Sequence, residues 1–288
     1  MLTSRHGSLT IVVRFAHAGT AAAHFSTNAA EHAVHLVPLP ALADNYIWLL
    51  HDDEGRAIVA DPGDDGPVEQ ALAASGLQLR AILLTHHHPD HIGGATALRD
   101  RHGVPVYAPE DERIAMATLR VRDGERITLS QPRASFEVIA VPGHTLSHVA
   151  YHGAGVLLAG DTLFSMGCGR LFEGTPAQML ASLDRLATLP ADTLLCCGHE
   201  YTVANGRFAC GIEPDNAALS ARRREVAALR EQQRPSLPVT MASELATNPF
   251  LRTDMPAVID WCARQSGQAT DRVARFAAVR AAKDAFRA

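Results

Sequence analysis

Short apolar runs and amphipathic stretches follow one another along most of the chain. Residues 81–85 (AILLT) form a short apolar run, which is typical of a strand covered on both faces. Similar runs predict further strands at residues 46–50, 57–60, 104–108, 136–140, 149–152, 156–159 and 193–196. Periodic apolar positions predict helices at residues 68–75, 95–102 and 176–187. Because strands and helices intermix without a regular βαβ rhythm, we expect an α+β fold of packed sheets with helices outside.

The pattern changes after about residue 203. Residues 216–233 and 271–287 are rich in alanine and arginine, have helical periodicity and are separated by prolines. We therefore expect three parts, which are an N-terminal extension at 1–34, a main domain at 35–203 and a smaller helical domain at 204–288. Residues 1–30 contain no acidic residue, which fits a disordered tail, a targeting signal or upstream sequence that is not native.

Composition narrows the class of protein. Of the 288 residues, 47% are hydrophobic and 20% charged, and no apolar run approaches the roughly 18 residues that span a bilayer. Residues 1–205 carry 13 arginines against 22 acidic residues, whereas residues 206–288 carry 13 basic against 9 acidic residues. This basic excess fits an anionic ligand or random surface charge and is too small for a nucleic-acid-binding protein. Five cysteines without CxxC spacing indicate reduced thiols and a cytoplasmic protein, not a disulfide framework.

The run AILLT leads directly into a dense group of histidines, HHHPDH at residues 86–91. Alternate residues of an extended chain point the same way, so we expect His86 and His88 to converge on one metal ion. Asp90 and His91 follow the bend at the proline and are expected to converge on a second ion. Imidazole with carboxylate is a ligand set that suits zinc, and also iron or manganese. A solvated loop of histidines is the alternative, and the spacing after a buried strand disfavours it.

Further candidate ligands stand where later apolar strands end, each beside a glycine that allows a tight turn. The complete set, sufficient for two divalent metal ions with Asp161 bridging them, is His86, His88, Asp90, His91, His144, Asp161 and His199. His87 faces the other way and is not expected to be a ligand. Asp61 and His148 are expected to lie behind the ligands, because a metal-bound imidazole needs a partner on its other nitrogen.

With these motifs the chain resembles the metallo-β-lactamase superfamily and, within it, the glyoxalase II family of hydroxyacylglutathione hydrolases. The HxHxDH pattern indicates only the superfamily. The more specific segments are GCGRLFEGT (167–175), HEYT (199–202) and RAAKD (280–284), and the resemblance extends from about residue 35 to the end. It implies an αββα sandwich followed by a helical domain. It also implies one metal at His86, His88 and His144, a second at Asp90, His91 and His199, and Asp161 between them.

The resemblance also implies a glutathione site. The family's glutathione-binding positions map onto Arg170, Tyr201, Arg280 and Lys283, with His199 and Phe172 beside the substrate; some members have a tyrosine in place of Phe172. Lys283 is the only lysine in the sequence, against 25 arginines. It follows Arg280 by three residues on a predicted helix, so the two share a face and are placed to clamp a carboxylate. A solvated helix end, favoured by the helix dipole, is the alternative.

The implied activity is hydrolysis of S-D-lactoylglutathione to glutathione and D-lactate by a metal-bound hydroxide, the second step of methylglyoxal detoxification. Asp90 and Asp161 are the expected catalytic carboxylates, two divalent ions, zinc before iron or manganese, are the expected cofactors, and we expect a monomer. A glutathione persulfide dioxygenase is one alternative, and it would be an iron oxidoreductase. A phosphodiesterase is another, although the acidic catalytic half is a poor electrostatic match to nucleic acid. A binding protein without catalysis would not need seven ligands.

Overall fold

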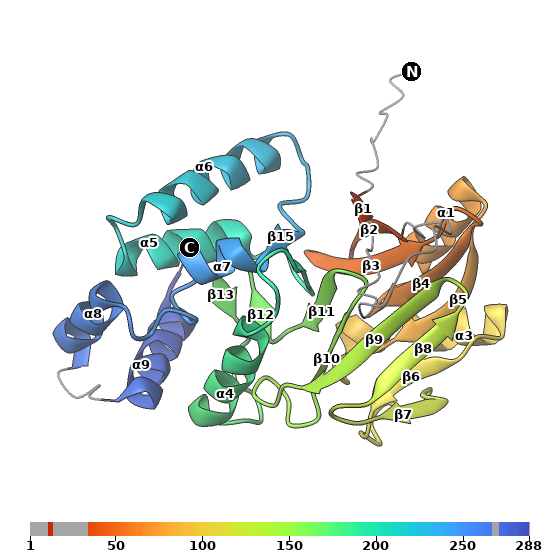
Figure 1. Ribbon diagram of the computed structural model, residues 1–288, viewed down its shortest axis with the longest axis horizontal. Coiled ribbons are helices and arrows are strands. Elements are labelled where there is room, and N and C mark those ends of the chain that lie inside the picture. Colours follow the sequence, from red (N-terminus) through yellow and green to blue (C-terminus); the bar gives the residue numbers. More distant parts are fainter. Residues whose placement is uncertain (1–10, 14–33, 267–270, 288) are drawn as a thin grey trace, which may run out of the picture.

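The computed structural model describes residues 11–13, 34–266 and 271–287. The first part of the chain forms a seven-stranded sheet in the order β1-β2-β3-β4-β5-β6-β7 (Figure 1). Neighbours are antiparallel from β1 to β4 and parallel from β4 to β7. The strands are β1 (Ile11–Val13), β2 (Val34–Ala41), β3 (Asn45–His51), β4 (Arg56–Ala60), β5 (Gln78–Leu83), β6 (Val106–Pro109) and β7 (Leu119–Val121).

A second, six-stranded sheet has the order β15-β14-β11-β10-β9-β8, and β12 and β13 form a separate hairpin. Only β11 and β14 are parallel neighbours in this sheet. The edge strand β15 comes from the C-terminal part of the chain, so that part adds a strand to the second sheet. The strands are β8 (Arg126–Ser130), β9 (Arg133–Ala140), β10 (Val149–Gly153), β11 (Val156–Gly160), β12 (Leu163–Phe164), β13 (Gly167–Cys168), β14 (Leu194–Cys197) and β15 (Val239–Thr240).

The apolar runs of the first sheet are explained by burial on both faces. In β3, Trp48 packs in the large core shared with the second sheet, whereas its neighbour Leu49 packs in a second core beneath α1 (Asp65–Ser75) and α3 (Ala95–His102). In β5, Leu83 likewise packs in the core shared with the second sheet, and Ile82 packs in the second core. Because successive side chains of a strand point to opposite faces, a strand between two cores must be apolar at nearly every position.

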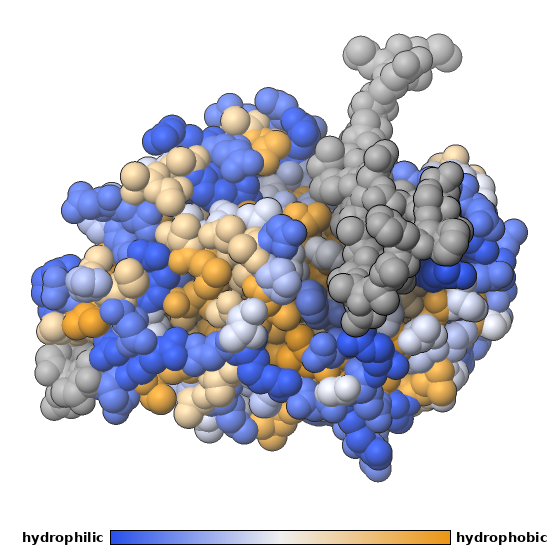
Figure 2. Space-filling view, viewed as in Figure 1, coloured by the Kyte–Doolittle hydropathy of each residue, from blue (hydrophilic) through white to orange (hydrophobic). Residues whose placement is uncertain are grey.

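Helices cover the outside of the sheets and build the C-terminal part. Helices α5 to α9 gather at one end of the molecule, beside the second sheet (Figure 1). On the face seen in Figure 2, hydrophobic residues gather where helices α5 to α9 meet the sheets. Within the described residues, no helix has the length and apolar character to cross a membrane. The helices are α1 (Asp65–Ser75), α2 (Pro89–Ile92), α3 (Ala95–His102), α4 (Pro176–Ala187), α5 (Thr202–Ile212), α6 (Ala217–Glu231), α7 (Met241–Thr247), α8 (Pro256–Ser266) and α9 (Arg272–Ala285).

The helical region shares its core with the sheets. Phe208, Phe250 and Phe276 are buried and belong to the same cluster as Phe164 of the β12–β13 hairpin. Rings of the first three contact one another, with Phe250 lying 6.3 Å from Phe208 and 5.7 Å from Phe276. Burial of this much aromatic surface fixes the helices against the β12–β13 hairpin, which follows the inner strand β11 of the second sheet.

Two local expectations differ from the structure. Helix α1 begins at Asp65, three residues earlier than predicted, because Asp64 caps it and Pro67 lies in the first turn, where its missing N–H is not needed. Residues 11–13 lie in the extension for which a disordered tail, a targeting signal or non-native sequence was expected, and they form β1, which pairs with β2; the other residues of 1–33 lie outside the described residues. The division into domains at residue 203 stays a prediction.

Candidate metal centre

The ends of four strands supply the candidate ligands. His86 and His88 follow β5, and the short helix α2 then carries Asp90 and His91. The loop after β9 carries His144, β11 leads into Asp161, and β14 leads into His199. All these segments leave their strands on the same side of the fold, so side chains from residues 86 to 199 meet in one place.

Two glycines make this convergence possible. Gly160 has φ +48°, and a Cβ there would lie 2.3 Å from the Thr85 hydroxyl oxygen. A Cβ on Gly198 would lie 2.5 Å from Asp161 Oδ1. Real Cβ atoms do not approach other atoms so closely, so both strand ends require glycine for the backbone to pass beneath the polar side chains.

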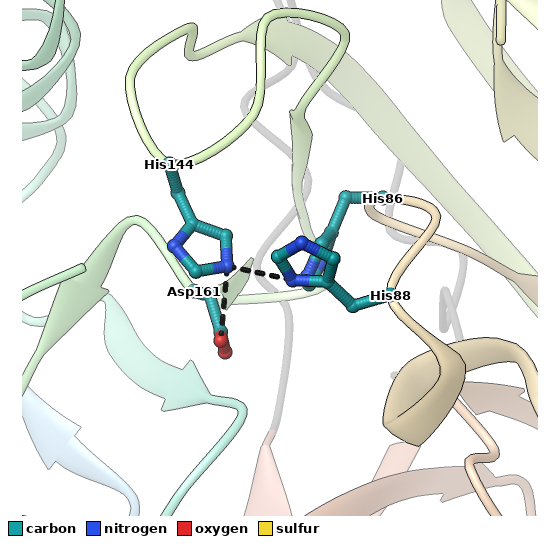
Figure 3. Close-up of side chains that lie close together, drawn as sticks. All are labelled: His86, His88, His144 and Asp161. Atoms are coloured by element: carbon teal, nitrogen blue, oxygen red, sulfur yellow. Dashed lines mark hydrogen bonds and ion pairs between the residues drawn. The ribbon is translucent and has the colours of Figure 1, made fainter. Parts of the chain in front are cut away.

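The first group of candidate ligands is His86, His88, His144 and Asp161 (Figure 3). Its four ligand atoms all lie within 4.8 Å of one another. His88 Nδ1 lies 3.1 Å from His86 Nε2 and 3.0 Å from His144 Nε2. His144 Nε2 lies 3.4 Å from Asp161 Oδ2. Three imidazoles and a carboxylate thus face one point, as in four-coordinate metal sites.

The second group is Asp90, His91 and His199. Asp90 Oδ2 lies 3.5 Å from His91 Nε2 and 3.4 Å from His199 Nε2. Asp161 reaches this group as well, with Oδ1 3.3 Å from His91 Nε2 and Oδ2 3.4 Å from His199 Nε2. One carboxylate therefore contacts both groups, which is the position that a bridging ligand requires.

The donor atoms fit a pair of divalent cations. His91 Nε2 and Asp161 Oδ1 are buried and have no hydrogen-bond partner. An unpaired buried polar atom is costly unless an ion or water satisfies it, so two of them aimed at one another indicate a cation site. The chemistry of the set, five imidazoles and two carboxylates, suits zinc, iron or manganese.

Four of the five candidate ligand imidazoles, all except His88, are held from behind through Nδ1. Asp61 Oδ2 lies 3.1 Å from His91 Nδ1 and accepts the Thr85 hydroxyl, whose oxygen lies 3.0 Å from His86 Nδ1. Asp44 Oδ1 lies 2.8 Å from His199 Nδ1. The Arg170 carbonyl oxygen lies 2.8 Å from His144 Nδ1. These contacts turn the Nε2 atoms toward the centre.

The structure places Asp61 and His148 where the sequence predicted outer partners, and it adds others. His148 stacks on the His86 ring at 4.6 Å, and its Nε2 accepts the Asp161 N–H. Asp44 and Thr85 were not predicted as partners of the imidazoles. Asp44 and His199 are 155 residues apart, and no pattern in the sequence links the two.

Burial and neighbouring charge give the centre its electrostatic character. Burial lowers the pKa of His86 well below its ordinary value, so this imidazole is neutral at pH 7. Burial also opposes a charge on His199, but hydrogen bonds to Asp161 and Asp90 outweigh it and raise its pKa to about 10. Burial opposes the charge of Asp161 too, yet the charge at His91 holds its pKa well below the usual range. The carboxylates of Asp90 and Asp161 therefore favour a positive charge between them.

Aromatic and basic side chains surround the centre. The Phe172 ring lies 5.2 Å from His144 and 5.5 Å from His88, and this side chain is 61% exposed. The Tyr201 ring stacks on His199 at 4.7 Å with an interplanar angle of 2°. Both rings thus contact candidate ligands and are partly exposed to solvent.

Two of the predicted glutathione residues, Arg170 and Arg280, meet at Asp284, and Lys283 precedes this aspartate in the chain. Arg170 Nε and Arg280 Nη2 lie 3.5 and 3.0 Å from Asp284 Oδ1. Arg280 is buried and donates to the Cys168 carbonyl, so much of its hydrogen bonding is directed into the protein. Lys283 is half-buried, with Nζ 5.9 Å from the ring centre of Phe208 and the same distance from that of Phe286.

Comparison with known families decides the assignment. Residues 43–199 match the metallo-β-lactamase superfamily, and residues 200–286 match the family model described as hydroxyacylglutathione hydrolase C-terminus. The chain is 51% identical over 255 residues to the hydroxyacylglutathione hydrolase of Xanthomonas campestris pv. campestris, covering 88% of this chain and 99% of that one. It is 53% identical over 255 residues to that of Stenotrophomonas maltophilia, with the same coverage. The chain belongs to the hydroxyacylglutathione hydrolase family.

These matches confirm the family and the fold class that the sequence predicted. They also confirm the enzyme class, because a hydroxyacylglutathione hydrolase is a thioester hydrolase. The helical C-terminal match also separates the chain from other enzymes with the same sandwich. The crystal structure of the BLEG-1 B3 metallo-β-lactamase superimposes with a TM-score of 0.59 at 25% identity, covering 75% of this chain and 99% of that one. The structure of TTHA1623 in a di-iron-bound form superimposes with a TM-score of 0.54 at 26% identity, covering 74% and 99%.

Proposed function

We propose that this hydroxyacylglutathione hydrolase is a dinuclear metalloenzyme that cleaves S-D-lactoylglutathione to glutathione and D-lactate. His86, His88 and His144 would hold one ion, Asp90, His91 and His199 the other, and Asp161 both. The observation that carries the proposal is the Asp161 carboxylate, whose two oxygens lie 3.3 to 3.4 Å from imidazoles of both groups. When bound, a pair of divalent ions supplies Lewis-acid activation of water and of the thioester carbonyl near neutral pH.

The chain's own residues orient the ligands and the substrate. Asp61 and Asp44 hold His91 and His199 through Nδ1, which leaves Nε2 free for the centre. Phe172 and Tyr201 limit the space above the ligands, and we propose that they position the acyl group and the adjoining part of glutathione. Arg170, Arg280 and Lys283 would give the region that receives the glutathione carboxylates a positive charge.

The overall reaction needs no protein nucleophile. Water adds its oxygen to the carbonyl carbon and gives up its two protons, and the carbon–sulfur bond breaks. Glutathione leaves as a thiolate that takes up one proton, and the other goes to solvent as D-lactate forms. Because a free thiol has a pKa of about 8.5, this leaving group does not need a strong general acid. Cys196 and Cys197 are buried in β14, which supports a structural role for both.

We further propose zinc as the native metal, a monomer in the cytoplasm, no nucleic-acid or membrane partner, and a role in methylglyoxal detoxification. The imidazole-rich ligand set supports zinc, although iron and manganese accept the same donors. Cys168, Cys196, Cys197 and Cys210 form no disulfide in the part of the chain that the structure describes, which supports a reducing compartment.

Metal analysis combined with substrate comparison tests the proposal. We expect about two equivalents of divalent metal per chain and rapid hydrolysis of S-D-lactoylglutathione, lost on chelation and restored by added zinc. Glutathione persulfide with oxygen, and bis(p-nitrophenyl) phosphate, serve as the substrates of the dioxygenase and phosphodiesterase alternatives. Faster turnover of either of these than of the thioester would contradict the proposed function.

A further inference from the structure

A cluster of charged side chains lies beside the first ligand group and contributes none of its ligands. Arg113 is at its centre, and it donates from Nε and Nη2 to the two carboxylate oxygens of Asp111 at 2.8 and 2.7 Å. Its Nη1 donates to Glu173 Oε1 at 2.6 Å. Arg113 and Glu173 are 60 residues apart, so this guanidinium joins two segments that are distant in the sequence.

The same carboxylates also hold the loop that carries His144. Glu173 Oε2 accepts the backbone N–H of Leu146 at 2.7 Å. Asp111 Oδ2 accepts the Ser147 hydroxyl at 2.5 Å. Leu146 and Ser147 directly follow His144 and Thr145 in the chain. Three loops therefore meet through one arginine and two carboxylates.

His87 connects the cluster to the ligand loop. Its Nδ1 lies 3.5 Å from Asp111 Oδ2, and its Nε2 lies 3.8 Å from Glu173 Oε1. Nδ1 is buried and has no hydrogen-bond partner, and the ring meets that of His88 edge-on at 4.8 Å. The histidine that the sequence set apart from the ligands thus packs between the ligand loop and the two carboxylates.

Glu173 also belongs to the loop that covers the centre. Its neighbour Phe172 contacts the His144 and His88 rings, and the Phe172 N–H donates to the His144 carbonyl at 3.2 Å. Arg170 lies at the start of the same loop. Phe172 is 61% exposed, so packing alone does not fix its position. The polar contacts of Glu173 therefore add a side-chain restraint to this part of the loop.

We propose that Arg113, Asp111 and Glu173 form a brace that positions loop 170–174 over the first ligand group for substrate binding. All three are positioning residues. Arg113 lowers the pKa of the carboxyl groups of both Asp111 and Glu173, so the brace is fully charged at neutral pH. A loop held in its binding conformation loses less entropy when substrate binds. This inference rests on the proposed function for the identity of the substrate that the loop meets.

The test compares Arg113→Ala and Glu173→Gln, singly and together, with Arg122→Ala as the matched control. Arg122 is exposed and pairs with Glu110, next to the brace but outside it. A looser loop weakens the binding of the substrate and of the transition state equally. KM for S-D-lactoylglutathione should therefore rise about fivefold in each single variant, and kcat should change less than about twofold. The double variant should resemble the single variants, because both remove the same contact. Arg113→Lys should restore part of the loss, and Arg122→Ala should behave as wild type.

Hydrogen exchange of the metal-loaded protein gives a readout that does not depend on turnover. Backbone amides of residues 144–148 and 170–175 should exchange faster in Arg113→Ala than in wild type or Arg122→Ala. A role limited to stability would lower the melting temperature and the active fraction, while KM and the exchange of these two segments stayed as in wild type. That result would overturn the brace. If wild type cleaves no glutathione thioester, the proposed function fails, and the exchange experiment still tests the brace.

Discussion

At the scale of single residues, the centre depends on carboxylates with different positions. Asp161 lies between the two ligand groups, whereas Asp61 lies behind them and contacts His91 Nδ1 and the Thr85 hydroxyl. In the proposed dinuclear centre, loss of Asp161 removes a donor from both metal positions. Loss of an outer carboxylate leaves all seven ligands in the chain but frees two imidazoles to rotate.

Asp161→Asn should therefore lower the metal content and abolish thioester hydrolysis while the fold is kept. Asp61→Asn should retain metal more fully and lose activity by about 10- to 100-fold, the usual effect of removing a partner of a metal-bound histidine. Metal analysis, circular dichroism and kcat for S-D-lactoylglutathione distinguish the two variants. Near-normal metal occupancy and turnover in Asp161→Asn would contradict a dinuclear centre.

The cysteines give a second prediction at this scale. Burial raises the pKa of Cys168 to about 11 and raises that of Cys196 well above its ordinary value, so both stay protonated and unreactive. Cys210 is only half-buried. Iodoacetamide at neutral pH should label Cys210 before either of these and leave hydrolysis unchanged. Inactivation in step with labelling of Cys196 would indicate a thiol mechanism instead.

At the scale of elements, the loop between β13 and α4 joins the metal centre to α9. The carbonyl of Arg170 holds His144, while the Cys168 carbonyl accepts a hydrogen bond from Arg280 on α9. Arg280 thus has a structural task besides any contact with glutathione. Lys283, one turn later, has its ammonium near aromatic rings and is half-buried.

The two basic residues of α9 should therefore respond differently to substitution. Lys283→Ala should raise KM for a glutathione thioester about tenfold, equal to about 1.4 kcal/mol, with kcat little changed. Arg280→Ala should also raise KM and in addition lower the melting temperature, because it leaves the buried Cys168 carbonyl without this donor.

A small thioester that lacks glutathione is the control substrate for the α9 variants. Its hydrolysis should hardly change in Lys283→Ala, because this side chain is expected to meet only the glutathione moiety. An equal loss of hydrolysis with both substrates would mean that α9 supports the fold and does not bind the glutathione moiety.

At the scale of the molecule, the sequence predicts what depends on local pattern and misses what depends on packing. His86, Asp161 and His199 were predictable because each follows an apolar strand, and strand ends on one side of a sandwich meet. Asp44 was not predictable as the partner of His199, since that contact depends on how the β2–β3 turn meets β14. The spacing of Arg280 and Lys283 places both on one helix face. Only the packing of α9 on the β12–β13 hairpin determines that Arg280 is buried there.

The N-terminal part gives the last prediction. β1 pairs with β2 at three positions, all at the beginning of β2, whereas β2 keeps seven paired positions with β3 after β1 is removed. Asp44 lies beyond the opposite end of β2, and every candidate ligand comes from residues 86–199. Removal of residues 1–33 therefore leaves the buried Val34 and the whole centre in place.

We expect this truncated protein to retain its metal, with kcat/KM within about twofold of the full chain. The loss of three pairings should lower the melting temperature by about 2 °C. The uncovered edge of β2 should also make the truncated protein more prone to self-association at high concentration, because an unpaired edge strand is a template for other strands. Calorimetry, size-exclusion chromatography and the thioester assay measure these effects separately. A truncated protein that is folded and metal-loaded but inactive would show that the N-terminal residues build part of the site.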